Sequence, residues 1–494
     1  MRQKMPIFYS ALMLTAVNLL LRFAGTSFQV YISSRIGPAG VGLLQLVMSV
    51  GMLAMVAGMA GVRTASMYLS AEELGRKCPE NVAWVLSGCF VYSILCSGAV
   101  AAALYSLAPY LAEHWIGDIR TLEAIRLYAA FLPVSCLCGV MTGFFTAANR
   151  IGILAAVEVA EQAISMTLTI WILHFWAGAD PTRACQAIII GSGTGGCLTL
   201  CALCLLRLRS RPATSPRIPV RRRLLQCAVP LAIGDIARTG ISTTENLMVP
   251  KRLALYHGTT TPLAAFGLIS GMVFPVLMFP AAILFGLAEL LIPELARCAA
   301  AGSTERIRYL VRRSLRTATI YGLIFCVLMV HLACPLCLRL YGNEEAADQL
   351  RRYALMIPML YCDAITDAMT KGLGQQKACV RYNIFTSAMD VALLFWLLPR
   401  HGMDGYYISF LVTHGINFML SLRRLLQISQ VKISVLKPTA AIGATALTLV
   451  VTRGIAAPFP AVCASLAVLG CLLFLLGVLR REDIRWIESL IKNK

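Results

Sequence analysis

The feature that most constrains the fold is a series of fourteen apolar runs, each about as long as a membrane-spanning helix. A helix needs about 20 apolar residues to cross the hydrocarbon core of a bilayer, and it satisfies its backbone polar groups internally. We therefore expect an all-α polytopic membrane protein, in which the first run is a retained span and not a signal peptide. The runs occupy residues 7–33, 41–62, 81–108, 124–145, 151–176, 184–206, 224–249, 262–292, 314–337, 352–372, 381–399, 404–422, 436–455 and 459–479.

The composition excludes the main soluble classes. Apolar residues make up 58% of the chain and charged residues only 14%, whereas soluble domains carry about 25% charged residues. A soluble multidomain enzyme and a disordered chain are both excluded. Most of the 18 cysteines lie in apolar runs, so the Cys201/Cys204 and Cys334/Cys337 spacings predict core packing. We expect no metal site and no cofactor beyond a coupling Na⁺ or H⁺.

The excess of basic residues is explained by the orientation of the chain in the membrane. The chain holds 44 Lys and Arg against 24 Asp and Glu, a net charge of +20. If the N-terminus is cytoplasmic and the spans alternate, 31 of the 44 basic residues lie on the cytoplasmic side. This asymmetry follows the positive-inside rule, so we expect both termini in the cytoplasm. Nucleic acid is not an expected partner, because it does not explain the hydrophobicity.

A polybasic stretch predicts the domain organisation. Residues 207–223, RLRSRPATSPRIPVRRR, contain seven Arg, three Pro and no acidic residue, and this predicts a cytoplasmic linker. It would join an N-terminal lobe of six helices, 1–206, to a C-terminal lobe of six, 224–430. Two further helices in 431–479 and an amphipathic cytoplasmic tail in 480–494 complete the prediction. The linker either anchors the topology or attracts anionic lipid or substrate.

Ionisable residues inside the apolar runs are the candidate functional residues. Each costs about 2.5–3.5 kcal/mol to place at the centre of a span. So many of them imply a polar, water-filled cavity between helices, and hence transport. The candidates are Arg22, Glu158, Glu161, Asp235, Arg238, Glu245, Asp363, Asp367, Asp390 and His414, with Arg63 at the inner end of the second run.

The two signs of charge suggest two roles. Arg22, Arg63 and Arg238 would form a cationic cavity for a phosphate or diphosphate, because a guanidinium donates a bidentate fork. The carboxylates Asp235, Glu245, Asp363, Asp367, Asp390, Glu158 and Glu161 are candidates for binding a coupling Na⁺ or exchanging H⁺. Structural roles remain open, since Asp235 and Arg238 have the spacing of an ion pair and Glu161 and Asp390 can bond neighbouring helices.

Several segments resemble a known family. FAGTSFQVYISSRIGPAGVGLLQL (23–46) after Arg22 is similar to the first-helix region of the stage V sporulation protein B family. Arg63 departs from the family, which typically has Pro nearby, and Glu245 stands where Asp is common. The other similar segments are 58–72, 143–162, 229–253, 266–280, 291–296 and 371–383.

This resemblance implies membership of the multidrug/oligosaccharidyl-lipid/polysaccharide exporter (MOP) superfamily. It implies a MATE-like bundle of two six-helix lobes with two further helices, working by alternating access in the bacterial inner membrane. The implied activity is the flipping of an undecaprenyl-diphosphate-linked oligosaccharide or peptidoglycan precursor, with sporulation as one setting. Arg22 is the best match to a cavity arginine. The partners expected are this lipid-linked sugar and membrane lipids, and the chain is expected to be a monomer.

Three other functions are alternatives to this one. An ion-coupled multidrug or organic-cation antiporter of the same fold is the main alternative, and Asp363 and Asp367 keep it open. A membrane enzyme is disfavoured, because no nucleophile, metal set or phosphate loop accompanies those two carboxylates. A scaffold without transport activity is disfavoured by the buried charges.

Overall fold

A computed structural model describes residues 7–76, 80–148, 150–177, 180–208, 220–258, 261–431, 436–455 and 457–478. Within these ranges the secondary structure is helical and includes no strand. Nine of the described helices are long and apolar enough to cross a membrane, or ten if the bent pair Pro262–Met278 and Ala281–Ala288 forms one span. The expected all-α membrane fold is therefore confirmed.

Each of the fourteen apolar runs overlaps described helix, but two helices each contain two runs or most of two runs. These are α1 (Ile7–Met59, 53 residues) and α14 (Gln376–Ser429, 54 residues). The number of fourteen spans and the cytoplasmic location of both termini stay predictions. The amphipathic tail 480–494 and most of the linker, 209–219, lie outside the described residues.

Both of these long helices are interrupted near their middle. In α1 the break is at Gly37, whose φ of 70° and ψ of 173° are not helical, and Pro38 follows it. In α14 the break is at Gly402, with φ 56° and ψ −135°, three residues after Pro399. Glycine adopts positive φ without steric penalty, and proline lacks the amide hydrogen that continues a helix. Each helix therefore consists of two segments, in agreement with the two apolar runs that it contains.

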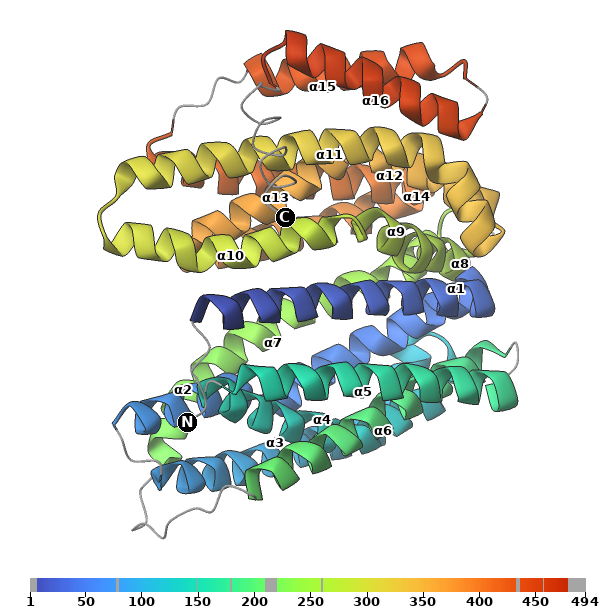
Figure 1. Cartoon of the computed structure of the whole chain (residues 1–494). Coiled ribbons are helices and arrows are strands. Elements are labelled where there is room, and N and C mark those ends of the chain that lie inside the picture. Colours follow the sequence, from blue (N-terminus) through green and yellow to red (C-terminus); the bar gives the residue numbers. More distant parts are fainter. Residues whose placement is uncertain are drawn as a thin grey trace. The chain divides into compact units, whose positions relative to one another are not determined.

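The chain forms two compact units (Figure 1). Unit 1 comprises Met1–Gly271 with Val391–Met403, and unit 2 comprises Met272–Asp390 with Asp404–Lys494. Besides α1, the helices that lie in unit 1 are α2 (Val62–Gly75), α3 (Asn81–Tyr110), α4 (Leu122–Ala147), α5 (Ile151–Ile172), α6 (Pro181–Leu208), α7 (Val220–Leu253) and α8 (Pro262–Gly267). Those in unit 2 are α9 (Phe274–Met278), α10 (Ala281–Ala300), α11 (Thr304–Tyr341), α12 (Glu344–Ala354), α13 (Ile357–Gly372), α15 (Leu436–Thr452) and α16 (Pro458–Leu475), together with both ends of α14.

The units do not follow the expected lobe boundaries, because α7 and α8 pack against α1 inside unit 1. The division into lobes at 206 and 224 stays a prediction.

Short π-helical turns continue α3, α5 and α8; they are Leu111–Ile116, Leu173–Ala177 and Leu268–Val273.

Glycines allow α1 and α8 to approach each other closely in unit 1. A methyl group on Gly267 would lie 1.9 Å from the Pro38 carbonyl oxygen, and one on Gly42 would lie 2.3 Å from the Leu263 carbonyl oxygen. The Ser33 hydroxyl donates to the Gly271 carbonyl at 2.8 Å in the same region. Small residues bring helix backbones together in membrane proteins, where packing and polar contacts replace the hydrophobic effect between helices. This contact therefore depends on glycine.

In unit 2, α15 and α16 pair with each other and pack on α11 (Figure 1). Leu469 and Leu473 of α16 are buried against Leu323 and Val327 of α11. A three-way hydrogen-bonded group, which we call the α11–α15–α16 triad, adds polar contacts. Ser465 Oγ lies 2.8 Å from His331 Nε2 and 2.9 Å from Thr452 Oγ1, and the last two atoms are 3.1 Å apart. His331 therefore has a role in packing, as a bond partner of both terminal helices.

Candidate functional site

One face of α5 carries polar groups that bind other helices of unit 1. Glu161 Oε2 accepts a hydrogen bond from Thr199 Oγ1 of α6 at 2.9 Å. Gln162 Nε2 donates to the backbone carbonyl of Leu21 in α1 at 3.1 Å. Glu158 lies one turn before Gln162, is half-buried, and interacts electrostatically with Arg63 at the start of α2. Helix α5 thus contacts α6 and α1 through polar side chains, and Glu158 on the same helix senses the charge of Arg63.

These contacts place two of the expected cationic residues near the same stretch of α5. Arg22 directly follows Leu21, whose carbonyl is bonded to Gln162, and Arg63 interacts with Glu158. Residues four apart lie on one helix face, so the bond to Leu21 and the electrostatic interaction with Arg63 involve the same face of α5. Both arginine residues are exposed.

The start of α2 is held close to α4 by two small residues. A methyl group on Gly143 would lie 2.4 Å from the Arg63 carbonyl oxygen, and one on Gly139 would lie 3.7 Å from Arg63 Cβ. Ser66 adds a buried hydrogen bond, because its hydroxyl donates to the Val140 carbonyl at 2.9 Å. The backbone of Arg63 is therefore fixed while its side chain remains exposed.

The third expected cation, Arg238, lies on α7. Arg238 and Asp235 are both exposed, and among the described residues they form no ion pair with each other. Their spacing permits a contact without requiring one, since exposed side chains at i and i+3 retain rotamer freedom. No contact that the structure describes joins Arg238 to Arg22 or Arg63.

Further along α7, Glu245 is half-buried beside contacts that hold this helix to α1. Thr243 Oγ1 donates to the Ser49 carbonyl at 3.1 Å, and Asn246 Nδ2 donates to Ser49 Oγ at 3.0 Å. Glu245 therefore lies in a polar contact region between α7 and α1, separate from the α5 face.

A second polar group lies in unit 2, around the segment of α14 that follows the break at Gly402. Asp390 is 6% exposed, and its Oδ1 accepts hydrogen bonds from Ser409 Oγ at 2.6 Å and Thr413 Oγ1 at 3.2 Å. Asn417 Nδ2 donates to both carboxylate oxygens of Asp363 in α13, at 3.3 and 3.4 Å. The spacing of Ser409, Thr413 and Asn417 places them on one face, so this face connects the two carboxylates. We call this group the α14 polar seam.

The other unit 2 candidates are arranged differently. Asp367 forms an ion pair with Lys371 one turn later, at 2.6 Å, and its charge is therefore neutralised locally. His414 stacks on Phe410, with ring centroids 3.9 Å apart, and its Nδ1 lies 3.1 Å from the Phe410 carbonyl oxygen. Asp363 and Asp390 are thus the two carboxylates of unit 2 that bond to the same face of α14, each through its own partners.

The sequence did not single out Ser409, Thr413 and Asn417, although the spacing of four in SFLVTHGIN (409–417) was a usable signal. The side-chain oxygen of Asn417 is buried and has no hydrogen-bond partner in the described residues. An unsatisfied buried oxygen beside a carboxylate suits a cation or a proton donor. No group of three or more Asp, Glu, His or Cys that could hold a metal ion occurs in the described ranges.

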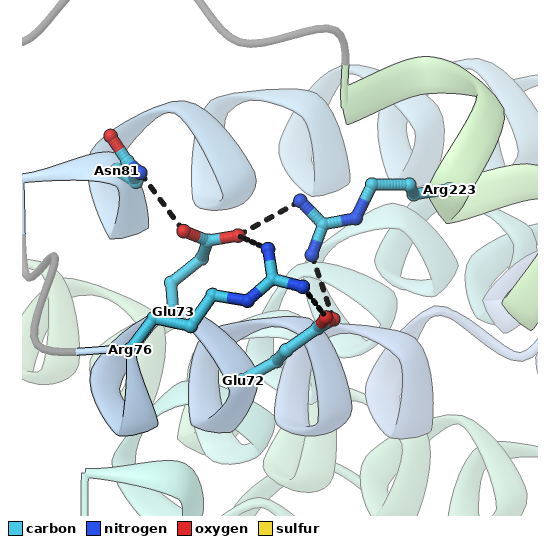
Figure 2. Close-up of polar contacts among 5 residues, drawn as sticks. All are labelled: Glu72, Glu73, Arg76, Asn81 and Arg223. Carbon is cyan, nitrogen blue, oxygen red and sulfur yellow. Dashed lines mark hydrogen bonds and ion pairs between the residues drawn. The ribbon is translucent and has the colours of Figure 1, made fainter.

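An ion-pair cluster, which sequence reasoning also missed, joins α2 to the start of α7 (Figure 2). Arg223 donates to Glu73 Oε1 at 2.8 Å through Nη1 and to Glu72 Oε2 at 2.7 Å through Nη2. Asn81 Nδ2 donates to Glu73 Oε2 at 2.9 Å, and Arg76 bonds Glu72 at 2.6 Å. The cluster therefore fixes the end of the polybasic segment to α2. Arg207 lies at the other end of this segment, with its guanidinium carbon 4.6 Å from the Phe144 ring centroid.

The MatE family model matches residues 14–175 and 230–396, which is more than half of the chain. The chain belongs to the MatE family. Stage V sporulation protein B of Bacillus subtilis (strain 168) is 22% identical over 417 residues, covering 80% of this chain and 79% of the relative. Members of this family are transporters and not enzymes, so the chain is a multi-pass membrane transporter.

Solved structures share the fold at low sequence identity. An inward-facing multidrug resistance MATE transporter of the MOP superfamily has a TM-score of 0.66 and 14% identity, covering 85% of this chain and all (100%) of that one. A MOP superfamily transporter from Pyrococcus furiosus has a TM-score of 0.60 and 16% identity, covering 86% and 96%. The bent form of a Vibrio cholerae MATE transporter has a TM-score of 0.59 and 17% identity, covering 85% and 97%. These likenesses confirm the MATE-like fold.

Proposed function

We propose that this transporter is a flippase for a lipid-linked oligosaccharide or peptidoglycan precursor carried on undecaprenyl diphosphate in the bacterial inner membrane. The observation that carries the proposal is that two exposed arginines relate to the same face of α5: Arg22 follows Leu21, which bonds Gln162, and Arg63 interacts electrostatically with Glu158. A diphosphate carries several negative oxygens in a compact group, and guanidinium groups bind such groups by paired hydrogen bonds. Arg238, on α7, would add a third cation.

Similarity to Stage V sporulation protein B supports this substrate class over a drug substrate, and sporulation is a proposed setting. The Pyrococcus furiosus relative is described as having a binding pocket of reverse polarity that suggests a different function. The polarity of the pocket therefore varies within this fold, and an arginine-rich site is compatible with it. The proposed partners are the lipid-linked sugar and membrane lipids, and the proposed oligomeric state is a monomer.

The α14 polar seam is the proposed place for ion coupling. Among the described residues, Asp363 accepts long bonds, at 3.3 and 3.4 Å, from a side-chain amide whose own oxygen is buried without a partner. Carboxylate and amide oxygens are ligands for hard cations, and a buried carboxylate also exchanges protons readily. Binding of Na⁺ or H⁺ there would bias alternating access, because a ligand shifts a conformational equilibrium by its differential affinity for the two states.

The second candidate function is an ion-coupled multidrug or organic-cation antiporter. An aromatic group in unit 2 favours it, since Phe410 lies 5.1 Å from Phe274 and 6.0 Å from Tyr353 between ring centroids, close to the α14 polar seam. Aromatic faces attract organic cations. The exposed guanidinium groups of Arg22 and Arg63 would repel such a substrate from unit 1, so we favour the anionic lipid-linked sugar.

The test uses a flippase-deficient bacterial strain and proteoliposomes. The wild-type chain is expected to restore growth and to move a fluorescent lipid-linked precursor between leaflets, whereas R22A and R63A should each lose at least about tenfold in rate. R22K should retain part of the activity, and R120A provides a matched control, because Arg120 pairs with Asp118 away from the α5 face.

Two results would contradict the proposal. Full complementation by the R22A/R63A double variant would remove the cationic site from the mechanism. Unchanged precursor distribution on depletion, together with altered efflux of a cationic dye, would support the multidrug antiporter instead.

A further inference from the structure

The first turns of α11 carry an arginine–tyrosine–arginine group in unit 2. Arg306, Tyr309 and Arg313 follow a spacing of three and four residues, which places them on one helix face. The guanidinium carbons of Arg306 and Arg313 lie 5.9 and 5.7 Å from the Tyr309 ring centroid. Arg313 Nη1 also donates to the Tyr309 hydroxyl. The tyrosine ring therefore lies between two cationic side chains and helps to hold them together.

An open hollow of about 630 Å³ lies beside this group. It is lined by residues 302–306 and Tyr309, so it combines the hydroxyls of Ser303 and Thr304 with the Arg306 guanidinium. Glu305 also lines it and adds one negative charge. Outside the lining, Glu294 lies 3.9 Å from Arg306 but pairs more closely with Arg297, at 2.7 Å. With Arg312 exposed on the next turn, the neighbourhood keeps an excess of positive charge.

The length of α11 places this group near the depth of lipid headgroups. The helix has 38 residues, which is about 57 Å at 1.5 Å per residue and almost twice the hydrocarbon thickness. Its apolar part extends from Arg316 to Arg339 and is long enough for one crossing. Arg313 therefore lies about one turn outside the hydrocarbon and Tyr309 about two turns outside it. Tyrosine is enriched at this interface, and arginine side chains reach toward it.

We propose that this hollow binds the phosphate group of an anionic phospholipid in the cytoplasmic leaflet. Guanidinium groups bind phosphate oxygens through charge-assisted hydrogen bonds, and basic residues beside a membrane are attracted to anionic lipid. The cytoplasmic side follows from the distribution of basic residues along the chain. The lipid would be a bound component of the transporter, distinct from the substrate and from the Arg22 and Arg63 face in unit 1.

The test measures lipid binding to the full chain in detergent by native mass spectrometry, with phosphatidylglycerol as the probe. R306Q/R313Q should bind phosphatidylglycerol roughly tenfold or more weakly than the wild type. R339Q/R351Q is the matched control, since it removes two exposed arginines from other parts of unit 2 and should leave binding unchanged. R306K/R313K should retain most of the affinity, because it keeps both charges.

Three outcomes would overturn the proposal. Equal loss in R306Q/R313Q and R339Q/R351Q would show that net charge alone attracts the lipid. Equal affinity of the wild type for phosphatidylcholine would show that the anionic headgroup is not recognised. If R306Q/R313Q fails to fold, hydrogen exchange of the wild type replaces the binding measurement. Phosphatidylglycerol should then slow the amide exchange of residues 302–313, whereas inorganic phosphate and phosphatidylcholine should not. Absence of that protection would refute the site.

Discussion

The ion-pair cluster of Figure 2 contains two neighbouring glutamates that differ mainly in burial, and this difference predicts unequal contributions to stability. Both accept a hydrogen bond from Arg223, Glu72 at 2.7 Å and Glu73 at 2.8 Å. The side chain of Glu72 is 28% exposed, whereas that of Glu73 is 3% exposed and has a further bond from Asn81. The perturbation is the isosteric change of each glutamate to glutamine.

The magnitudes follow from these environments. Loss of an exposed ion pair costs about 0–1 kcal/mol, because water screens the charges, and this applies to E72Q. Breaking a fully buried pair costs about 3–5 kcal/mol, but in E73Q the partner Arg223 keeps its bond to Glu72 and is 29% exposed. A charged hydrogen bond is worth about 1.5–3 kcal/mol. We therefore expect E73Q to lower the free energy of unfolding by about 2–3 kcal/mol.

The assay is reversible unfolding in mixed detergent micelles, followed by circular dichroism, for both variants with and without R223Q. The double-mutant cycle should give a larger coupling energy for Glu73 with Arg223 than for Glu72 with Arg223. Equal losses in E72Q and E73Q, or a larger loss in E72Q, would refute the reasoning that burial determines the strength of these pairs.

Three further predictions concern packing and buried bonds. G267A should destabilise the fold by about 1–3 kcal/mol or more through overpacking, since the new methyl group would meet backbone, whereas G98A has open space and should change the melting temperature little. S409A should cost about 1–3 kcal/mol, because it removes the 2.6 Å hydrogen bond to buried Asp390, and a shift in chemical unfolding checks this. S465A should increase hydrogen exchange in α15 and α16 while leaving that of unit 1 unchanged, because both bonds of this buried hydroxyl lie within unit 2.

The sequence predicted the helices well because the bilayer imposes both their length and their composition. Apolar runs of about 20 residues marked all of the described spans, and Gly37 and Gly402 divide the two helices that each contain two runs. What the runs do not specify is which helices pack together. The placement of α7 beside α1 depends on side-chain bonds such as that between Asn246 and Ser49, which are 197 residues apart in the chain.

The candidate site was predictable in residue type but not in arrangement. Depth in a span identified Arg22 and Glu158, because a charge there is costly unless it is used. The contact between α1 and α5 near these residues depends on Gln162, an uncharged residue that bonds the backbone of Leu21 and gives no signal in a search for charges. Conversely, the i, i+3 spacing of Asp235 and Arg238 suggested an ion pair. Exposed side chains at this spacing need not form one. The pair of Glu73 with Arg223 joins segments 150 residues apart, so local spacing could not reveal it.

The α11–α15–α16 triad has a consequence for how the two terminal helices can move. Two helices with leucine-rich faces can slide past one another in a bilayer at a small cost in free energy, since one apolar contact replaces another of similar strength. A bonded histidine, serine and threonine have only one alignment along the helix axes that satisfies all three groups. The triad therefore sets the vertical register of α15 and α16 on α11. A variant that lacks it should keep these helices in the membrane but leave them without a unique height relative to α11.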